Sequence, residues 1–571
     1  MTAVPPTLLP EARVWQRIRR YAVPATMIEA CAAARSAGDW RTACAAGRID
    51  VAVDLADLAR EHSRRQAERI EGDLTALAPD LLRWHLPRVL GGRTSLATHQ
   101  QWLLSTHDDR FADTDLALLL HTPKTVDGSQ RLRLTVGPAR QDLSGRRDLP
   151  PPFWSAAHVD GLATAYGGSA GRLPGFTPDG DVLPFDAYAT TVDPADPATR
   201  TEVFERYVAA GALADAWAVA GLDLDPDIAT GDPTTNATVA AVHRQFVPLG
   251  LPTELTRLHR RYGVDRAMIG GQWRILAAVR RRDDGGTAVS FPGYDRDNFS
   301  HLRMADVVHD RPVDLELLRT GLLDHTGLHP LVRQALFPSA TPGPPAAGAE
   351  AGADAASAAT GGVTLRVPVR CGGRWHTLVH ADGRLDPVSH TPEEIARERM
   401  LVALGGPTAG CVAAVRAWHG SGDRLPRPLK QLRRDVLQRI QHGGSAALTA
   451  LLDAGLDPRM GDGRGGTLLH HLRALDDVTP LHRLVEAGVP VDAPDRRGRT
   501  ALHVAVGDGG TPELVAALLA AGADPKATDG NGWTVTELAD GKASMYDYDD
   551  EGDPEHPQVR IRDLVEEWVK R

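Results

Sequence analysis

Histidine and aspartate recur in HLRMADVVHD, residues 301–310, and both residue types bind metal ions. If this segment is helical, Asp306, His309 and Asp310 share one face, because residues three and four apart are neighbours on a helix. His301 lies nearby in the sequence. Imidazole nitrogens and carboxylate oxygens are common ligands of divalent transition metals. These four residues are candidates for a metal site, but the same spacing also suits a helix with a solvated polar face.

The dipeptide His309-Asp310 resembles the His-Asp pair of HD-type phosphohydrolases. The other elements of that family are not identified in the sequence, so the resemblance depends on the dipeptide alone. An enzyme or effector with a catalytic or metal site in residues 96–336 is therefore the alternative interpretation. We predict no catalytic residue, no metal and no cofactor.

The segment RWHTLVH, which begins at Arg374, places His376 and His380 on the same side of an expected strand. Two imidazoles there could bind a metal, but no third ligand follows at a recognisable spacing. The cysteines are far apart and form no CxxC pair: Cys31, Cys44, Cys371 and Cys411. We therefore expect half-buried strand histidines and buried free thiols in a reducing compartment.

A motif recurs near the C-terminus at spacings of 33 and 34 residues. It reads DGRGGTLLHHL from Asp462, DRRGRTALHVA from Asp495 and DGNGWTVTELA from Asp529. This succession of a turn, a helix start, a second helix and a glycine stop resembles the ankyrin repeat. The resemblance is specific for about residues 464–539 and implies an all-α solenoid that binds proteins.

The matched positions have structural roles. We expect threonines to cap the first helices, at Thr467, Thr500 and Thr534. Gly498 suits a turn with positive φ, and Gly522 suits the end of a second helix. The family resemblance implies that His470 and His503 connect one repeat to the next. The third copy departs from the family, because Glu537 replaces the histidine.

Arginines and one tryptophan gather at the predicted turns: Arg464, Arg496, Arg497, Arg499 and Trp533. Both residue types are enriched in binding hot spots, so these residues predict contact with a protein partner that has an acidic surface. In one alternative the arginines are only solvated and Trp533 packs on the adjacent turn. In the other, an acidic loop at residues 547–555 masks the arginines.

The elements around these residues predict a multidomain α+β protein. We expect a helical region over 1–95, an α+β domain of unknown type over 96–337, and a flexible Pro/Ala/Gly linker over 338–362. A β-hairpin segment should follow over 363–391. The ankyrin-like array should occupy 392–571, with clear repeats at 462–540, an acidic insertion at 543–557 and a capping helix at 558–571.

The composition narrows the functions to consider. The formal net charge of -10 argues against a nucleic-acid partner. No signal-peptide pattern or long apolar run is present, so we expect a cytoplasmic protein without a membrane segment. The prediction from sequence is an intracellular adaptor whose ankyrin array binds a protein partner.

Overall fold

The computed structural model describes residues 11–224, 246–271, 274–291, 300–338, 365–371, 373–381, 384–404, 410–419, 425–544 and 557–570. The chain divides into two compact units. The first contains Met1–Pro123 and Arg131–Pro344, and the second contains Lys124–Gln130 and Pro345–Arg571. Apart from Pro338, the linker predicted at 338–362 lies outside the described residues, as does most of the acidic insertion predicted at 543–557.

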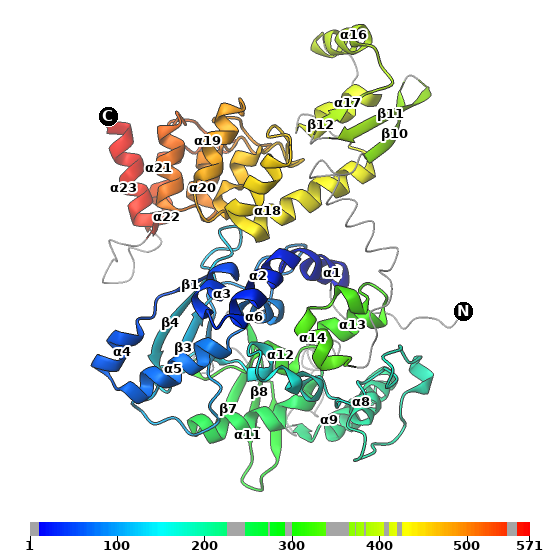
Figure 1. The fold of residues 1–571 in the computed structure, drawn as a ribbon, viewed down its shortest axis with the longest axis vertical. Helices are drawn as coiled ribbons and strands as arrows, with labels where there is room; N and C mark the ends of the chain where they lie inside the picture. Colours follow the sequence, from blue (N-terminus) through cyan, green and yellow to red (C-terminus); the bar gives the residue numbers. More distant parts are fainter. Residues whose placement is uncertain are drawn as a thin grey trace. The chain divides into compact units, whose positions relative to one another are not determined.

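The first unit mixes helices and strands (Figure 1). Its α-helices are α1 (Ala12–Tyr21), α2 (Ala25–Ser36), α3 (Trp40–Ala46), α4 (Leu55–Glu61), α5 (Arg64–Ala76), α6 (Pro79–His85), α7 (Leu162–Ala165), α8 (Ala198–Ala210), α9 (Leu213–Val219), α11 (Leu251–Tyr262), α12 (Asp306–His309), α13 (Val313–Arg319) and α14 (Pro330–Leu336). Its strands are β1 (Ile49–Val51), β2 (Gln101–Leu104), β3 (Leu116–His121), β4 (Leu132–Pro138), β5 (Arg147–Asp148), β6 (Leu222–Leu224), β7 (Arg266–Gly271), β8 (Arg274–Arg281) and β9 (Thr287–Ser290).

A five-stranded sheet has the order β1-β4-β3-β2-β5. The continuous apolar run at residues 116–120 and the alternating apolar residues at 132–136 predict strands, and β3 and β4 lie there. β1 lies inside the segment expected to be helical, and it pairs in parallel with β4 through Ile49 and Leu132. The β-branched Ile49 and Val51 flank Asp50, a pattern that suits a short strand. Pairing with β4 therefore overrides the local helical spacing.

A four-stranded sheet has the order β6-β9-β8-β7. β8 and β9 form the antiparallel hairpin that the glycine-containing turn predicts, and Gly285 in that turn has a φ of 85°. Residues 201–220 have helical spacing in the sequence, but this segment is divided between α8 and α9, because Gly211 adopts a φ of 73° and ends α8.

Helices from the N-terminal segment share one hydrophobic core with the five-stranded sheet. Ile70 and Leu81 of the helices and Leu118 and Leu134 of the strands all belong to this buried cluster. A second cluster joins α11 to β7 and β8, with Leu255 and Val279 as buried members. Each fully buried leucine contributes about 2 kcal/mol from the removal of apolar surface from water.

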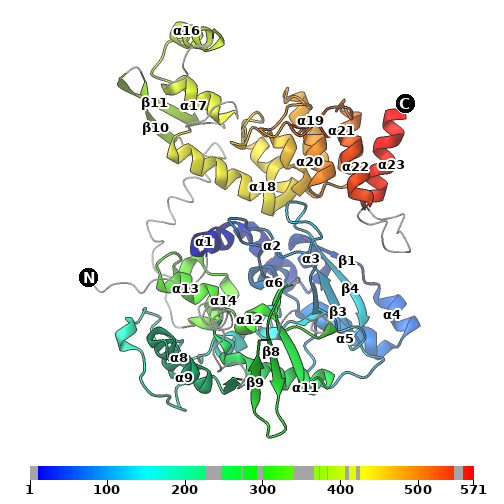
Figure 2. The same cartoon turned by 180° about the vertical axis from the view of Figure 1, so that it is seen from behind.

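The second unit begins, after Lys124–Gln130, with a three-stranded antiparallel sheet and continues as a row of helices (Figure 2). The sheet contains β10 (Leu365–Cys371), β11 (Arg374–Ala381) and β12 (Arg384–Asp386). The helices are α16 (Pro392–Ala403), α17 (Gly410–Trp418), α18 (Arg427–Asp453), the 3₁₀ helix η8 (Leu468–Ala474), α19 (Thr479–Glu486), α20 (Ala501–Gly507), α21 (Pro512–Ala520), α22 (Val535–Ser544) and α23 (Pro557–Lys570).

The helices α18 to α23 stack in chain order, and both views show them side by side. α18 is interrupted at Gly444, whose φ of 66° and ψ of -153° are not helical. The Gly443-Gly444 pair between two helical stretches of the sequence predicts two helices, and the break lies at this pair. None of the helices within the described ranges is both long and apolar enough to cross a bilayer.

Candidate functional site

Each ankyrin-like motif presents a turn, and we call these three turns the repeat tips: residues 462–466, 495–499 and 529–533. An aspartate begins each tip and closes the turn with its side chain. Asp495 Oδ1 accepts hydrogen bonds from the backbone N–H groups of Arg497 (2.8 Å) and Arg499 (3.0 Å). Asp462 and Asp529 make the same two bonds in their own tips. An aspartate opens every copy of the motif, and this recurrence is the sequence signal for its role in the turn.

Backbone hydrogen bonds join neighbouring tips. The N–H of Arg496 donates to the carbonyl oxygen of Arg464 (2.9 Å), and the N–H of Gly530 donates to that of Arg497 (2.7 Å). Gly498 has a φ of 74°, and a Cβ added there would lie 2.5 Å from the Gly530 nitrogen. Glycine is therefore required both by conformation and by space. The three tips form one edge with a defined backbone geometry.

Two buried histidines connect successive repeats. The N–H of Thr467 donates to Nδ1 of His470 (3.0 Å), so Nε2 carries the proton of the neutral ring. This Nε2–H donates to the carbonyl oxygen of Arg499 in the next repeat (3.0 Å). His503 repeats the arrangement, with Nε2 3.3 Å from the carbonyl oxygen of Trp533. Burial lowers the pKa of His470, although the bond to Arg499 opposes this shift.

The threonines and the second glycine lie at helix ends. Oγ1 of Thr500 accepts a bond from the N–H of His503 (3.4 Å) at the start of α20. In the last repeat, Oε2 of Glu537 accepts from the N–H of Thr534 (2.8 Å), while Oγ1 of Thr534 accepts from the N–H of Glu537 (3.2 Å). This reciprocal pair is a capping box. Gly522 follows α21 with a φ of 94°.

The predicted partner-binding residues fall into two groups. Four have exposed side chains at the tips: Arg464, Arg496, Arg497 and Trp533. The side chain of Trp533 is 54% exposed. Arg499 is half-buried, with Nη2 2.9 Å from Asp495 Oδ2 and Nη1 2.8 Å from Asp508 Oδ2. Its charge is balanced by two carboxylates, so Arg499 stabilises its own tip. The side chains of the other three arginines are exposed.

HLRMADVVHD forms a single helical turn, α12, in place of the longer helix that its spacing suggests. Residues 303–304 are extended, because the N–H of Arg303 bonds to the carbonyl oxygen of Arg146 (2.9 Å) and that of Met304 to Met268 (2.8 Å). Pro312 disfavours helical backbone at the residue before it. Competition from these backbone partners therefore limits the helix.

The four candidate metal ligands of this segment do not come together as one site. His309 is buried against Phe246, with ring centroids 4.8 Å apart, and its Nδ1 lies 3.0 Å from Oδ1 of Asp310. Asp306 has Oδ2 3.6 Å from Nε of Arg147. His301 is half-buried before α12. Across the residues that the structure describes, His301, Asp306, His309 and Asp310 form no group of three or more that could hold an ion.

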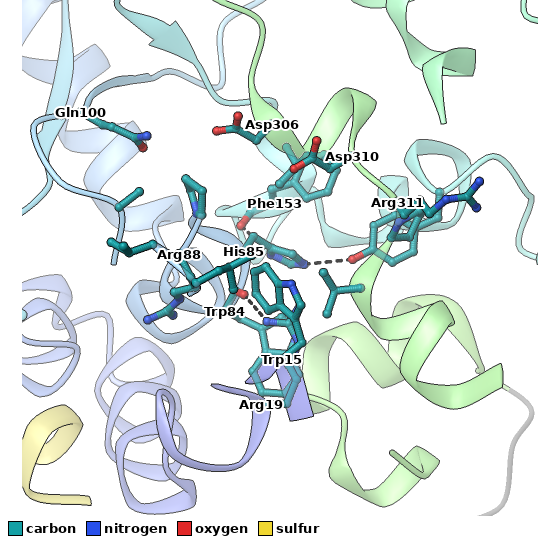
Figure 3. A pocket seen from close by; sticks show the side chains of 18 of the residues that line it. Trp15, Arg19, Trp84, His85, Arg88, Gln100, Phe153, Asp306, Asp310 and Arg311 are labelled. Atoms are coloured by element: carbon teal, nitrogen blue, oxygen red, sulfur yellow. Dashed lines mark hydrogen bonds between the residues drawn. The ribbon is translucent and has the colours of Figure 1, made fainter. Parts of the chain in front are cut away.

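A cavity of about 450 Å³ lies in the first unit, and Asp306 and Asp310 line it. Figure 3 shows these two carboxylates at one end and Trp15 and Arg19 at the other. Burial lowers the pKa of His85 in its wall to about 4, even though Asp314 raises it.

His85 and Arg88 add polar groups to this cavity. Nδ1 of His85 lies 3.0 Å from the carbonyl oxygen of Phe153, so this nitrogen carries the proton of the neutral ring. Burial, assisted by the charge of Arg19, lowers the pKa of Arg88 to about 9. The cavity thus combines carboxylates, a neutral imidazole and a guanidinium, which is a mixed lining for a small polar molecule.

The structure brings together a second cluster of possible metal ligands, which the sequence does not predict. Within the described ranges, the histidine, cysteine and carboxylate groups that come close enough to hold a metal ion are Cys371, His376, His390 and Cys411. Their ligand atoms all lie within 4.8 Å of one another. The sequence offers no CxxC signal, and the HxxxH spacing of His376 and His380 pairs His376 with a residue outside the cluster, because the four members come from separate segments.

Residues 484–539 match the family described as ankyrin repeats (many copies). No curated protein matches the chain. The C-terminal part of the chain is therefore an ankyrin-repeat region, as its repeated motif predicts. Stacked repeats of this kind generally bind other proteins through an extended surface.

Proposed function

We propose that the chain is an intracellular adaptor that binds a protein partner along the edge formed by its repeat tips. The observation that carries the proposal is the exposure of Arg464, Arg497 and Trp533 on tips whose backbone is already fixed. Binding to an ordered edge loses little conformational entropy, so more of the contact energy remains as affinity.

The chemistry of the tips favours an acidic partner surface. Arg464 and Arg497 present guanidinium groups, which suit paired contacts with carboxylates. Trp533 adds a large exposed apolar side chain on the third tip, and tryptophan is enriched in binding hot spots. Arg499 is not expected to contact the partner, because its guanidinium group already forms ion pairs with Asp495 and Asp508.

The first test locates the contact on the full chain. A photo-crosslinking amino acid at position 497 or 533 should capture one defined protein in cells. The same group at position 482, an exposed site on α19 away from the tips, serves as the matched control. Equal capture of that protein from all three positions would contradict contact through the tips.

The second test measures the role of charge. With the captured protein purified, the double variant Arg464→Glu/Arg497→Glu should weaken binding by at least about tenfold, or about 1.4 kcal/mol. Lys570→Glu reverses one charge, half the change made by the double variant, in the exposed final turn of α23 and should leave affinity within about twofold. If the double variant binds as tightly as the original chain while remaining folded, the acidic-partner proposal is wrong.

The alternative is an enzyme or effector whose site lies in the cavity of the first unit. The placement of Asp306 and Asp310 on its wall, near His85 and Arg88, is the observation in its favour. Manganese or iron that the full chain binds and that is lost on changing Asp306 and Asp310 to asparagine would support this alternative over the adaptor.

A further inference from the structure

We propose that Cys371, His376, His390 and Cys411 together bind one zinc ion in a structural site. This site lies in the second unit, upstream of the matched ankyrin repeats, and it does not depend on the proposed partner binding. Two thiols and two imidazoles within 4.8 Å of one another supply the four ligands that a tetrahedral zinc site needs.

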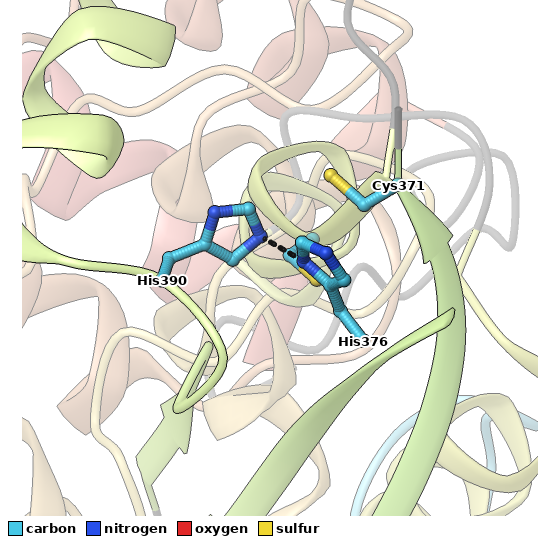
Figure 4. Close-up of side chains that lie close together, drawn as sticks. Cys371, His376 and His390 are labelled. Atoms are coloured by element: carbon cyan, nitrogen blue, oxygen red, sulfur yellow. Dashed lines mark hydrogen bonds between the residues drawn. The ribbon is translucent and has the colours of Figure 1, made fainter. Parts of the chain in front are cut away.

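The fold gathers these ligands from four places. Cys371 ends β10, His376 lies on β11, His390 precedes α16, and Cys411 lies in the first turn of α17. They are separated by 4, 13 and 20 residues in the sequence, so tertiary structure alone brings them together. Figure 4 shows the rings of His376 and His390 turned toward each other, with Cys371 beside them.

Strand pairing explains how β10 and β11 contribute one ligand each. In the antiparallel register Val369 pairs with His376, and Cys371 pairs with Arg374. Side chains two residues apart on a strand, and those directly opposite on its neighbour, share one face of the sheet. Cys371 and His376 therefore lie on the same face as the buried Val367 and Leu378. The opposite face carries Trp375, which is 72% exposed.

The two histidines are arranged as a ligand pair. Nδ1 of His376 lies 2.8 Å from Nε2 of His390, and the ring centroids are 4.5 Å apart. The other nitrogen of His390, Nδ1, lies 3.7 Å from Oε2 of Glu394. That separation exceeds hydrogen-bond distance, and the same oxygen accepts a bond from the N–H of Thr391 (2.9 Å), so Glu394 does not fix the tautomer of His390. Nε2 of His390, which faces His376, is the nitrogen placed to bind the ion.

The ligand chemistry selects the metal. Calcium and magnesium prefer oxygen ligands, whereas a set of two sulfurs and two imidazole nitrogens suits tetrahedral zinc. All four positions would be filled by protein groups, which leaves no place for a substrate or a reactive water. The zinc site is therefore structural, not catalytic.

A zinc ion at this position would stabilise the small sheet around it. The sheet of β10, β11 and β12 adds few apolar side chains to the buried core of the second unit, chiefly Val367, Leu378 and Leu385. Small sheets of this kind commonly need a metal or a disulfide for stability. A zinc ion would connect three segments of this sheet region to α17, whose Trp418 ring already contacts His380 with centroids 5.2 Å apart.

The experiment is metal analysis of the full chain, purified without affinity metals and supplied with zinc alone. We expect about one zinc per chain, and about fourfold coordination by two sulfurs and two nitrogens in X-ray absorption spectra. Cys371→Ser and His376→Asn should each lower the bound zinc at least about tenfold. Cys44→Ala in the first unit and His482→Asn on exposed α19 are the matched controls and should retain it.

A cobalt-loaded chain gives a second readout that does not depend on the folding of variants. Cobalt should show the visible absorption of a tetrahedral thiolate site, and added zinc should abolish it. Two outcomes would overturn the proposal. One is a folded chain that binds no zinc and shows four free thiols once it is unfolded in denaturant. The other is a Cys371–Cys411 disulfide, detected as a mass about 2 Da lower that reduction reverses.

Discussion

His470 connects two repeats only while its imidazole is neutral, because Nδ1 must accept the bond from Thr467. Burial lowers the pKa of this ring in the folded chain, while the unfolded chain keeps the ordinary value near about 6.5. At a pH between these two pKa values, the ring of His470 is protonated in the unfolded chain and neutral in the folded chain. The stabilisation from the neutral ring is therefore complete above about pH 6.5 and is lost as the pH falls below it.

The variant His470→Gln tests this pH dependence. At pH 7.5 the variant should lower the free energy of unfolding of the second unit by about 1–2 kcal/mol, because buried hydrogen bonds are lost. At pH 5.5 the difference from the original chain should be smaller, since protonation already weakens the original bond. Urea unfolding at the two pH values measures this difference. A difference that stays constant or grows on acidification would contradict the assigned ring state.

At the scale of the turns, two glycines with similar backbone geometry should respond differently to substitution. Gly498 and Gly522 both have positive φ, at 74° and 94°. A Cβ on Gly498 would meet the neighbouring tip, whereas nothing lies within 4 Å of a Cβ on Gly522. Gly522→Ala should therefore cost about 1 kcal/mol of stability from backbone strain alone. Gly498→Ala should cost about 2–4 kcal/mol because overpacking is added.

Chemical denaturation of the two full-length glycine variants provides the measurement. The close contact at Gly498 involves Gly530, which belongs to the next tip. Equal losses for both variants would show that strain at the residue, and not the joining of tips, explains the glycine at this position.

The repeat could be predicted from sequence because each of its signals is local. The Thr500, His503 and Gly498 positions recur at a fixed spacing, and each has its role within one turn or against the next copy. The zinc cluster is the opposite case. Cys371 and Cys411 are separated by 39 residues and become neighbours only through the packing of β10 against α17. No local pattern indicates such a pairing.

In the first unit, too, the sequence predicts secondary structure only where the signal is local. β3 was predictable from the apolar run at residues 116–120, which is long enough to mark a buried strand. β1 was not, because its three residues gain their strand partner only from β4, about eighty residues later. Likewise, the bonds of Arg303 and Met304 to distant backbone groups limit α12. Hydrogen bonds to distant parts of the chain therefore determine the secondary structure of both segments.

At the scale of the whole molecule, separate buried cores predict that a defect in one unit stays in that unit. Leu118 on β3 and Leu518 on α21 are both fully buried, the first in the core of the first unit and the second in that of the second. Replacing either with alanine leaves a cavity that costs about 2–5 kcal/mol. Hydrogen exchange of the full chain should therefore accelerate around β3 for Leu118→Ala and around the ankyrin helices for Leu518→Ala. Faster exchange in both units with either variant would mean that the two cores unfold as one cooperative structure.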